Sequence, residues 1–115
     1  MTPFKSGTVV LVRFPFTDLS SAKKRPAVII SPDSYSHRYG DVVIIPLTSV
    51  NQNDDQLYVS CWEESNLVKP TWVKPLLATI STSLIDRELG QLGKEDASCV
   101  HTALQKMLSP DFERR

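Results

Sequence analysis

The chain has 115 residues, with 13 Lys and Arg against 13 Asp and Glu, and 41% of its residues are hydrophobic. This length fits one domain over residues 1–115, and the apolar fraction is too high for a disordered chain. No apolar run approaches the roughly 18 residues of a membrane-spanning helix, and residues 1–7 contain no signal-peptide core. Its four Gly form no nucleotide-binding loop, and Cys61 and Cys99 lack metal-ligand spacing. We therefore expect a cytoplasmic protein with reduced thiols and no membrane partner.

Charge is distributed unevenly along the chain. Residues 1–40 carry six basic and two acidic groups (net +4), and residues 41–68 carry five acidic groups and no basic one (net −5). Residues 69–115 carry seven basic and six acidic groups (net +1), which brings the total to zero. The basic N-terminal third either creates a local positive field or is spread over solvated faces. This balance argues against indiscriminate nucleic-acid binding but leaves room for a small phosphate site.

Four runs rich in β-branched residues, bounded by Pro, Gly or polar segments, predict strands in the first half of the chain. They cover residues 7–14, 25–31, 41–47 and 57–62. The polar segments between them are expected to be surface loops or turns. These segments cover residues 17–24, 32–40 and 51–56.

The second half predicts short strands followed by helix. Residues 71–74 and 77–80 are strand-like pieces that Pro75 separates, and Ser83 is expected to cap a brief helix through Leu89. From residue 94 to 108 the apolar positions recur at helical spacing, which predicts a terminal helix. About five short strands with one terminal helix favour a mainly β fold, a small barrel in the α+β class, over alternating βαβ units.

Six segments together resemble the PemK/MazF family of bacterial toxins, the endoribonucleases (mRNA interferases) of type II toxin–antitoxin pairs. In order they are GTVV (7–10), FPFTD (14–18), KKRPAVIIS (23–31), PLTS (46–49), KPTWV (69–73) and LGQL (89–92). Each is weak alone, but their order and spacing extend the resemblance from about residue 7 to 108. It implies an SH3-like barrel of the CcdB/MazF type with a C-terminal helix. It also implies a homodimer, and a cognate antitoxin whose tail covers the RNA site.

The resemblance further implies metal-independent cleavage of single-stranded RNA, with 2′-OH attack giving 2′,3′-cyclic phosphate and 5′-OH ends. We expect no metal and no other cofactor, because ligand-like spacings of carboxylates or His are missing. Arg25 and Thr48 match the two central catalytic positions of the family. The guanidinium fork of Arg25 suits phosphate oxygens, and the Thr48 hydroxyl can hold the same phosphate. The alternatives are a solvated Arg25, and Thr48 and Ser49 hydroxyls that only satisfy a turn.

Other residues are predicted to contact RNA rather than to react with it. They are Phe16, Thr17, Lys23, Lys24, Ser49 and Lys74. The two adjacent lysines suit backbone phosphates, with a solvated loop as the alternative. Phe14, Phe16 and Trp72 are able to stack bases, although core packing is favoured for Phe14 and Trp72.

The residues do not identify a general base. The stretch 74–80, where some members of the family carry a carboxylate or polar residue, holds no acid. Asp18, Glu63 and His37 are candidates for the base. Otherwise, substrate positioning and electrostatic stabilisation account for most of the cleavage rate, or the activity is weak or lost. Two other functions therefore stay open: a CcdB-like toxin that poisons DNA gyrase, and an inactive SH3-like interaction module. The combination of Arg25 and Thr48 favours the nuclease, because a gyrase poison needs no phosphate site.

Overall fold

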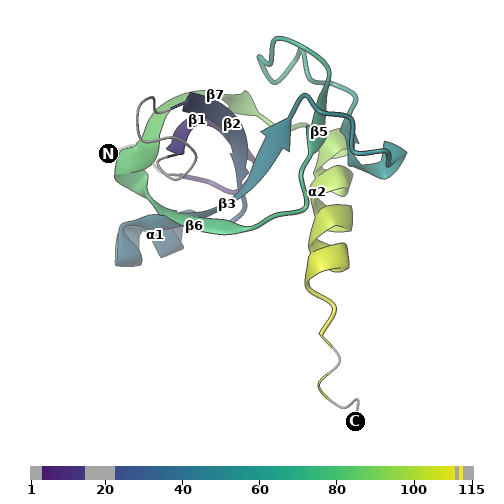
Figure 1. The fold of residues 1–115 in the computed structure, drawn as a ribbon. Helices are drawn as coiled ribbons and strands as arrows, with labels where there is room; N and C mark the ends of the chain where they lie inside the picture. Colours follow the sequence, from purple (N-terminus) through teal and green to yellow (C-terminus); the bar gives the residue numbers. More distant parts are fainter. Residues whose placement is uncertain (1–3, 15–22, 111, 113–115) are drawn as a thin grey trace.

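A computed structural model describes residues 4–14, 23–110 and 112, in which a curled antiparallel sheet stands beside a C-terminal helix (Figure 1). The strands are β1 (Thr8–Phe14), β2 (Lys23–Ile29), β3 (Asp41–Thr48), β4 (Tyr58–Val59), β5 (Thr71–Val73), β6 (Ala78–Ser81) and β7 (Ile85–Gln91). The helices are α1 (Asp33–Tyr39) and α2 (Lys94–Met107), and two 3₁₀ turns are η1 (Asp55–Leu57) and η2 (Thr82–Leu84). None of the described helices is long and apolar enough to cross a membrane.

The strand order of the sheet is β4-β5-β3-β2-β1-β7, with β6 also paired to β3. Ile44 of β3 pairs with Ile29 of β2 on one side and with Ala78 of β6 on the other. Farther along β3, Leu47 and Thr48 pair with β5 instead. The C-terminal end of β3 therefore lies between β2 and the short β4–β5 ribbon, and α2 packs beside that ribbon (Figure 1).

Alternation along the strands divides the core into two clusters on opposite faces of the sheet. The helix-side cluster packs against α2 and includes Val9, Val28, Ile45, Leu47, Leu57, Val59, Val73, Cys99, Val100 and Ala103. The inner cluster contains no residue of α2 and consists of Val10, Val12, Ala27, Ile29, Val42, Ile44 and Ile80. Because both faces of β1, β2 and β3 are buried in their central parts, these strands are the continuous apolar runs seen in the sequence.

The predicted fold class is confirmed: the molecule is a mainly β half-barrel with a C-terminal helix. The predicted strands 7–14, 25–31 and 41–47 correspond to β1, β2 and β3, with β2 shifted two residues toward the N-terminus. The pieces on either side of Pro75 are β5 and β6, and the helical periodicity after residue 93 corresponds to α2.

Three local predictions were wrong. Residues 32–40 are not only loop, because they contain α1, which ends at Gly40 in the left-handed conformation (φ 70°). The segment from Ser83 to Leu89 is not a helix but η2 followed by β7, which pairs with β1. The strand predicted at 57–62 is reduced to β4, since residue 57 ends η1 and a turn begins at residue 60.

Candidate active site

Arg25 and Thr48 belong to neighbouring antiparallel strands, β2 and β3, whose pairing ladder includes Ala27 opposite Pro46. Arg25 and Thr48 each lie two residues beyond the Ala27–Pro46 end of this ladder, Arg25 on β2 and Thr48 on β3. Alternation along each strand puts Arg25 on the side of Ala27 and Thr48 on the side of Pro46. The two residues therefore lie at the same end of the β2–β3 pair, although 22 residues of chain separate them.

The burial pattern of β2 explains why a charged side chain lies at this end. The strand runs from exposed Lys23, Lys24 and Arg25 into the fully buried segment 27–29. Pro26, between them, has no backbone donor to lose where the ladder with β3 ends. The buried C-terminal half of β2 packs in the core, and the three charged residues at its N-terminal end are exposed at the surface.

Thr48 is half-buried, and its hydroxyl has one defined partner. The Thr48 Oγ1 accepts a hydrogen bond of 3.1 Å from the backbone N–H of Val50. The Thr48 hydroxyl thus satisfies a turn, as the alternative interpretation expected, but this bond uses only part of its hydrogen-bonding capacity. A hydroxyl that accepts one bond keeps its own proton to donate. The hydroxyl is therefore able to donate a hydrogen bond to a phosphate oxygen.

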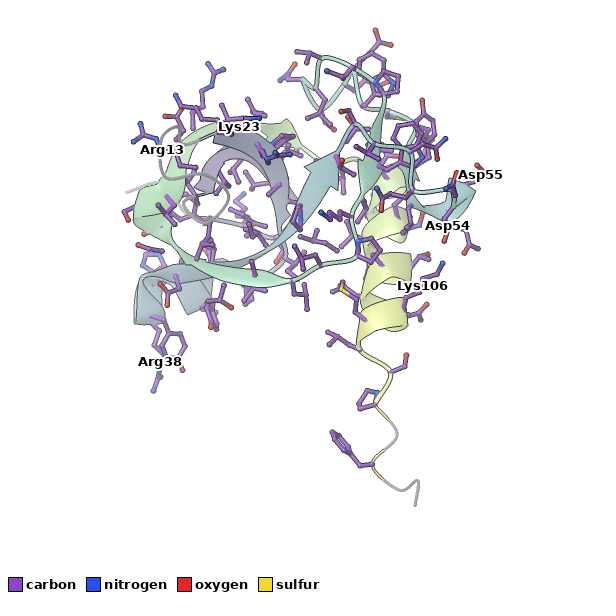
Figure 2. All side chains as sticks on the ribbon, viewed as in Figure 1. Arg13, Lys23, Arg38, Asp54, Asp55 and Lys106 are labelled. Carbon is purple, nitrogen blue, oxygen red and sulfur yellow. The ribbon has the colours of Figure 1, made fainter. Side chains whose placement is uncertain are left out.

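The two adjacent lysines of β2 fall on opposite faces. Lys23 alternates onto the face of Arg25 and lies at the upper rim of the sheet in Figure 2. Lys24 faces the other way, and its Nζ lies 3.2 Å from Asp86 Oδ1, which also lies 3.4 Å from Arg13 Nη2. The hydrogen bond from Lys24 holds the pKa of Asp86 below its ordinary value. The structure therefore brings Lys23 together with Arg25, but not Lys24.

The remaining predicted RNA-binding residues divide into two groups. Lys74 is exposed, and its backbone N–H donates to the carbonyl of Pro46 at 2.9 Å, which places it beside β3 near Thr48. Ser49 is exposed directly after Thr48. Phe16 and Thr17 lie outside the described residues.

Trp72 is a further residue near the site. The core packing favoured for it is confirmed, because it is half-buried and packs against the helix-side cluster. Its direct pairing with Thr48 across β3 and β5 was not anticipated. Its ring centroid lies 5.1 Å from that of Tyr58, with the rings tilted by 50°. The half-buried Trp72 alternates along β5 with the buried residues Thr71 and Val73.

The candidate general bases do not gather at Arg25. His37 lies in α1, which follows the opposite end of β2. Glu63 is exposed in a turn whose Ser65 and Asn66 donate hydrogen bonds to the carbonyls of Gln91 and Leu89, at the end of β7 farthest from Arg25. Asp18 lies outside the described residues. Within residues 4–14, 23–110 and 112, no three His, Cys, Asp or Glu side chains are grouped closely enough to hold a metal ion.

A family model described as the PemK-like, MazF-like toxin of type II toxin–antitoxin systems matches residues 5–108. The chain belongs to this toxin family. The match contains both Arg25 and Thr48 and every element from β1 to α2. No curated protein sequence matches the chain.

Solved structures of MazF proteins share the fold at low sequence identity. The MazE–MazF complex of Deinococcus radiodurans aligns with a TM-score of 0.73 and 19% identity, over 93% of this chain and 97% of the other. The Mycobacterium tuberculosis toxin MazF-mt6 gives 0.72 and 17%, over 91% and 99%. A mycobacterial endoribonuclease in complex with its cognate antitoxin gives 0.66 and 17%, over 97% and 99%. This MazF-like chain therefore has the MazF fold over nearly its whole length.

Proposed function

We propose that this MazF-like toxin is a cytoplasmic endoribonuclease that cleaves single-stranded RNA, including mRNA, without a metal cofactor. The observation that supports the proposal is the pairing of β2 and β3, which leaves Arg25 and Thr48 each two residues beyond the same Ala27–Pro46 end of the ladder. A phosphodiester has two non-bridging oxygens, and this pair offers separate donors for both. The Arg25 guanidinium supplies two parallel N–H donors for phosphate oxygens. The Thr48 hydroxyl supplies one donor on a short side chain, and the hydrogen bond that it accepts from the Val50 N–H fixes its position.

The chemistry proceeds by attack of the substrate's own 2′-oxygen on the adjacent phosphorus. The bond from the 2′-oxygen to phosphorus forms, the bond from phosphorus to the 5′-oxygen breaks, and the proton lost by the 2′-OH is balanced by one gained at the 5′-oxygen. Negative charge builds on the phosphorane in between, and fixed donors aimed at that charge lower the barrier. Arg25 acts as an electrostatic stabiliser rather than as an acid, because a guanidinium is a poor proton donor.

We further propose a cognate antitoxin and a second copy of this chain as protein partners. Two of the structures named above are toxin–antitoxin complexes, one from Deinococcus radiodurans and one mycobacterial. A short acidic and hydrophobic segment of the antitoxin suits the surface around Arg25, Lys23 and Lys74, which presents three cations. The homodimer follows from the resemblance to the family.

The decisive experiment incubates purified protein with mixed RNA in EDTA and maps the ends of the products. Cleavage with 2′,3′-cyclic phosphate and 5′-OH ends is expected for the wild type. It is expected to fall about 10²–10³-fold in Arg25→Ala, the usual cost of one preorganised donor. Arg38→Ala is the matched control, because Arg38 is an exposed arginine on α1, below the sheet at the left of Figure 2.

Three results would contradict the nuclease assignment. Cleavage that Arg25→Ala leaves unchanged would show that the guanidinium is not part of the site. Gyrase-dependent DNA breaks without RNA cleavage would support the gyrase poison instead. Neither activity, from a folded protein, would support the interaction module.

A further inference from the structure

One row of residues crosses the strands in register at the candidate site. Tyr58 of β4 pairs with Trp72 of β5, and Trp72 pairs with Thr48 of β3. Arg25 pairs with Val12 of β1 and lies two residues beyond the last β2–β3 pair, that of Ala27 with Pro46. Adjacent strands are about 4.8 Å apart, so the indole of Trp72 begins one strand away from the Thr48 hydroxyl. The row thus joins an aromatic pair to Thr48, one of the two groups proposed to hold the phosphate.

This aromatic pair lies on the β4–β5 ribbon, beside the C-terminal end of β3. The neighbours that alternate with it along β4 and β5, namely Leu57, Val59 and Val73, are buried in the helix-side cluster. Trp72 also packs against this cluster, and both Tyr58 and Trp72 remain half-buried rather than fully buried. Their rings contact each other at 5.1 Å between centroids, in a tilted arrangement. Large aromatic rings with a face partly open to solvent are suited to a planar ligand.

The backbone beneath the aromatic pair is held from behind by α2. The Cys99 thiol of α2 donates a hydrogen bond to the carbonyl of Tyr58 at 3.0 Å. Asp96, in the first turn of α2, is 1% exposed and accepts hydrogen bonds of 3.0 Å from the backbone N–H groups of both Ser60 and Cys61. A two-residue strand would otherwise be weakly held. These contacts fix the position of Tyr58 relative to Thr48.

We propose that Trp72 and Tyr58 form a stacking platform for one unpaired nucleobase of the RNA, next to the scissile phosphate. The inference rests on the proposed nuclease function and names how that site holds its substrate. Stacking of a base on an aromatic ring is largely indifferent to sequence, since every base has a π face. Lys74, which alternates with Val73 onto the same face and is exposed, is available to the neighbouring phosphate. A base on the platform keeps the adjacent phosphate beside Arg25 and Thr48.

The test first maps one cleavage site of the wild type in a short RNA. It then measures Kd for the same oligonucleotide made uncleavable by a 2′-deoxy nucleotide at the cut. Trp72→Ala is expected to weaken binding about 5- to 150-fold, the range for the loss of one stacked base. Trp72→Phe retains a ring and is expected to lose less than Trp72→Ala. Trp62→Phe is the matched control, because Trp62 packs against the helix-side cluster as Trp72 does but, unlike Trp72, does not pair with Thr48.

A second measurement identifies the base and does not depend on the folding of a variant. Each nucleotide flanking the cut is replaced in turn by an abasic one. At one of these positions, the abasic substitution is expected to weaken binding by the wild type. The factor is expected to equal the loss that Trp72→Ala causes with the intact RNA. Trp72→Ala is expected to bind the intact and that abasic oligonucleotide equally.

The outcomes separate this inference from the proposed function. If the wild type cleaves RNA but no flanking abasic position weakens its binding, the platform is refuted and the nuclease stands. The platform is refuted in the same way if Trp72→Ala binds RNA normally, or if it loses only binding to an acidic antitoxin-like peptide. If the wild type cleaves no RNA at all, the proposed function fails and the platform fails with it.

Discussion

Replacing Asp96 is the change whose effect on stability follows most directly from the structure. Its carboxylate is 1% exposed and accepts three hydrogen bonds, from Ser60 N–H (3.0 Å), Ser60 Oγ (3.2 Å) and Cys61 N–H (3.0 Å). These bonds connect the first turn of α2 to the turn that follows β4. Asp96→Ala removes the acceptor and leaves two backbone donors without a partner.

The magnitude follows from the cost of those orphaned donors. A buried donor left unsatisfied costs about 1–3 kcal/mol. Ser60 is at the surface, so water replaces part of what is lost. We expect Asp96→Ala to lower the free energy of unfolding by about 2–4 kcal/mol, and Asp96→Asn, which keeps one acceptor oxygen, by about 1–2 kcal/mol.

Urea unfolding followed by circular dichroism measures this effect. Ser98→Ala is the control, because the exposed Ser98 hydroxyl donates only to the carbonyl of Glu95 in its own helix. It is expected to stay within about 0.5 kcal/mol of the wild type. An Asp96→Ala variant as stable as Ser98→Ala would refute the idea that this carboxylate fastens β4 to α2.

Two further predictions concern the surface charges of β2. Lys23→Ala is expected to weaken RNA binding and to reduce its salt slope by about 1, with the cleavage motif unchanged, because phosphate contacts position without reading bases. Lys24→Ala is expected to have a smaller effect on the same salt titration, because its ammonium is already paired with Asp86; an equal effect would contradict the assignment of faces. The lowered pKa of Asp86 means that its carboxylate stabilises the fold above the ordinary aspartate pKa of about 4, and that this contribution disappears as the pH falls below it. Thermal unfolding is therefore expected to give Asp86→Asn a lower Tm than the wild type at pH 7 and the same Tm near pH 2; a Tm difference independent of pH would argue against the ion pair.

Strong local patterns predicted most of the fold. The continuous β-branched runs of β1, β2 and β3 are buried on both faces, and the apolar stripe of α2 packs against the sheet. The missed helix α1 has no buried residue, so it leaves no apolar period to read. Its signals are the flanking Pro32 and Gly40, with an acid in the first turn and basic residues in the last. The segment of β7, IDRELGQ, is rich in helix formers, and pairing with β1 overrides that propensity.

The candidate site was predictable only in part for a similar reason. The resemblance to the toxin family singled out Arg25 and Thr48, because those residues lie in short recognisable segments. Which other side chains share their face depends on strand register, and a shift of one residue reverses every face. Register separates Lys23 from Lys24 and sets Trp72 beside Thr48, which neither composition nor spacing reveals.

The central claim is that Arg25 and Thr48 act on the same phosphate, and a double-mutant cycle tests it most directly. Single-turnover cleavage at saturating RNA is measured for the wild type, Arg25→Ala, Thr48→Val and the double variant. Each single change is expected to slow cleavage about 10²–10³-fold. Because groups that act as a unit are not additive, the double variant is expected to lie within about tenfold of the slower single one. Losses that multiply in full, or a Thr48→Val enzyme as fast as the wild type, would contradict the shared phosphate.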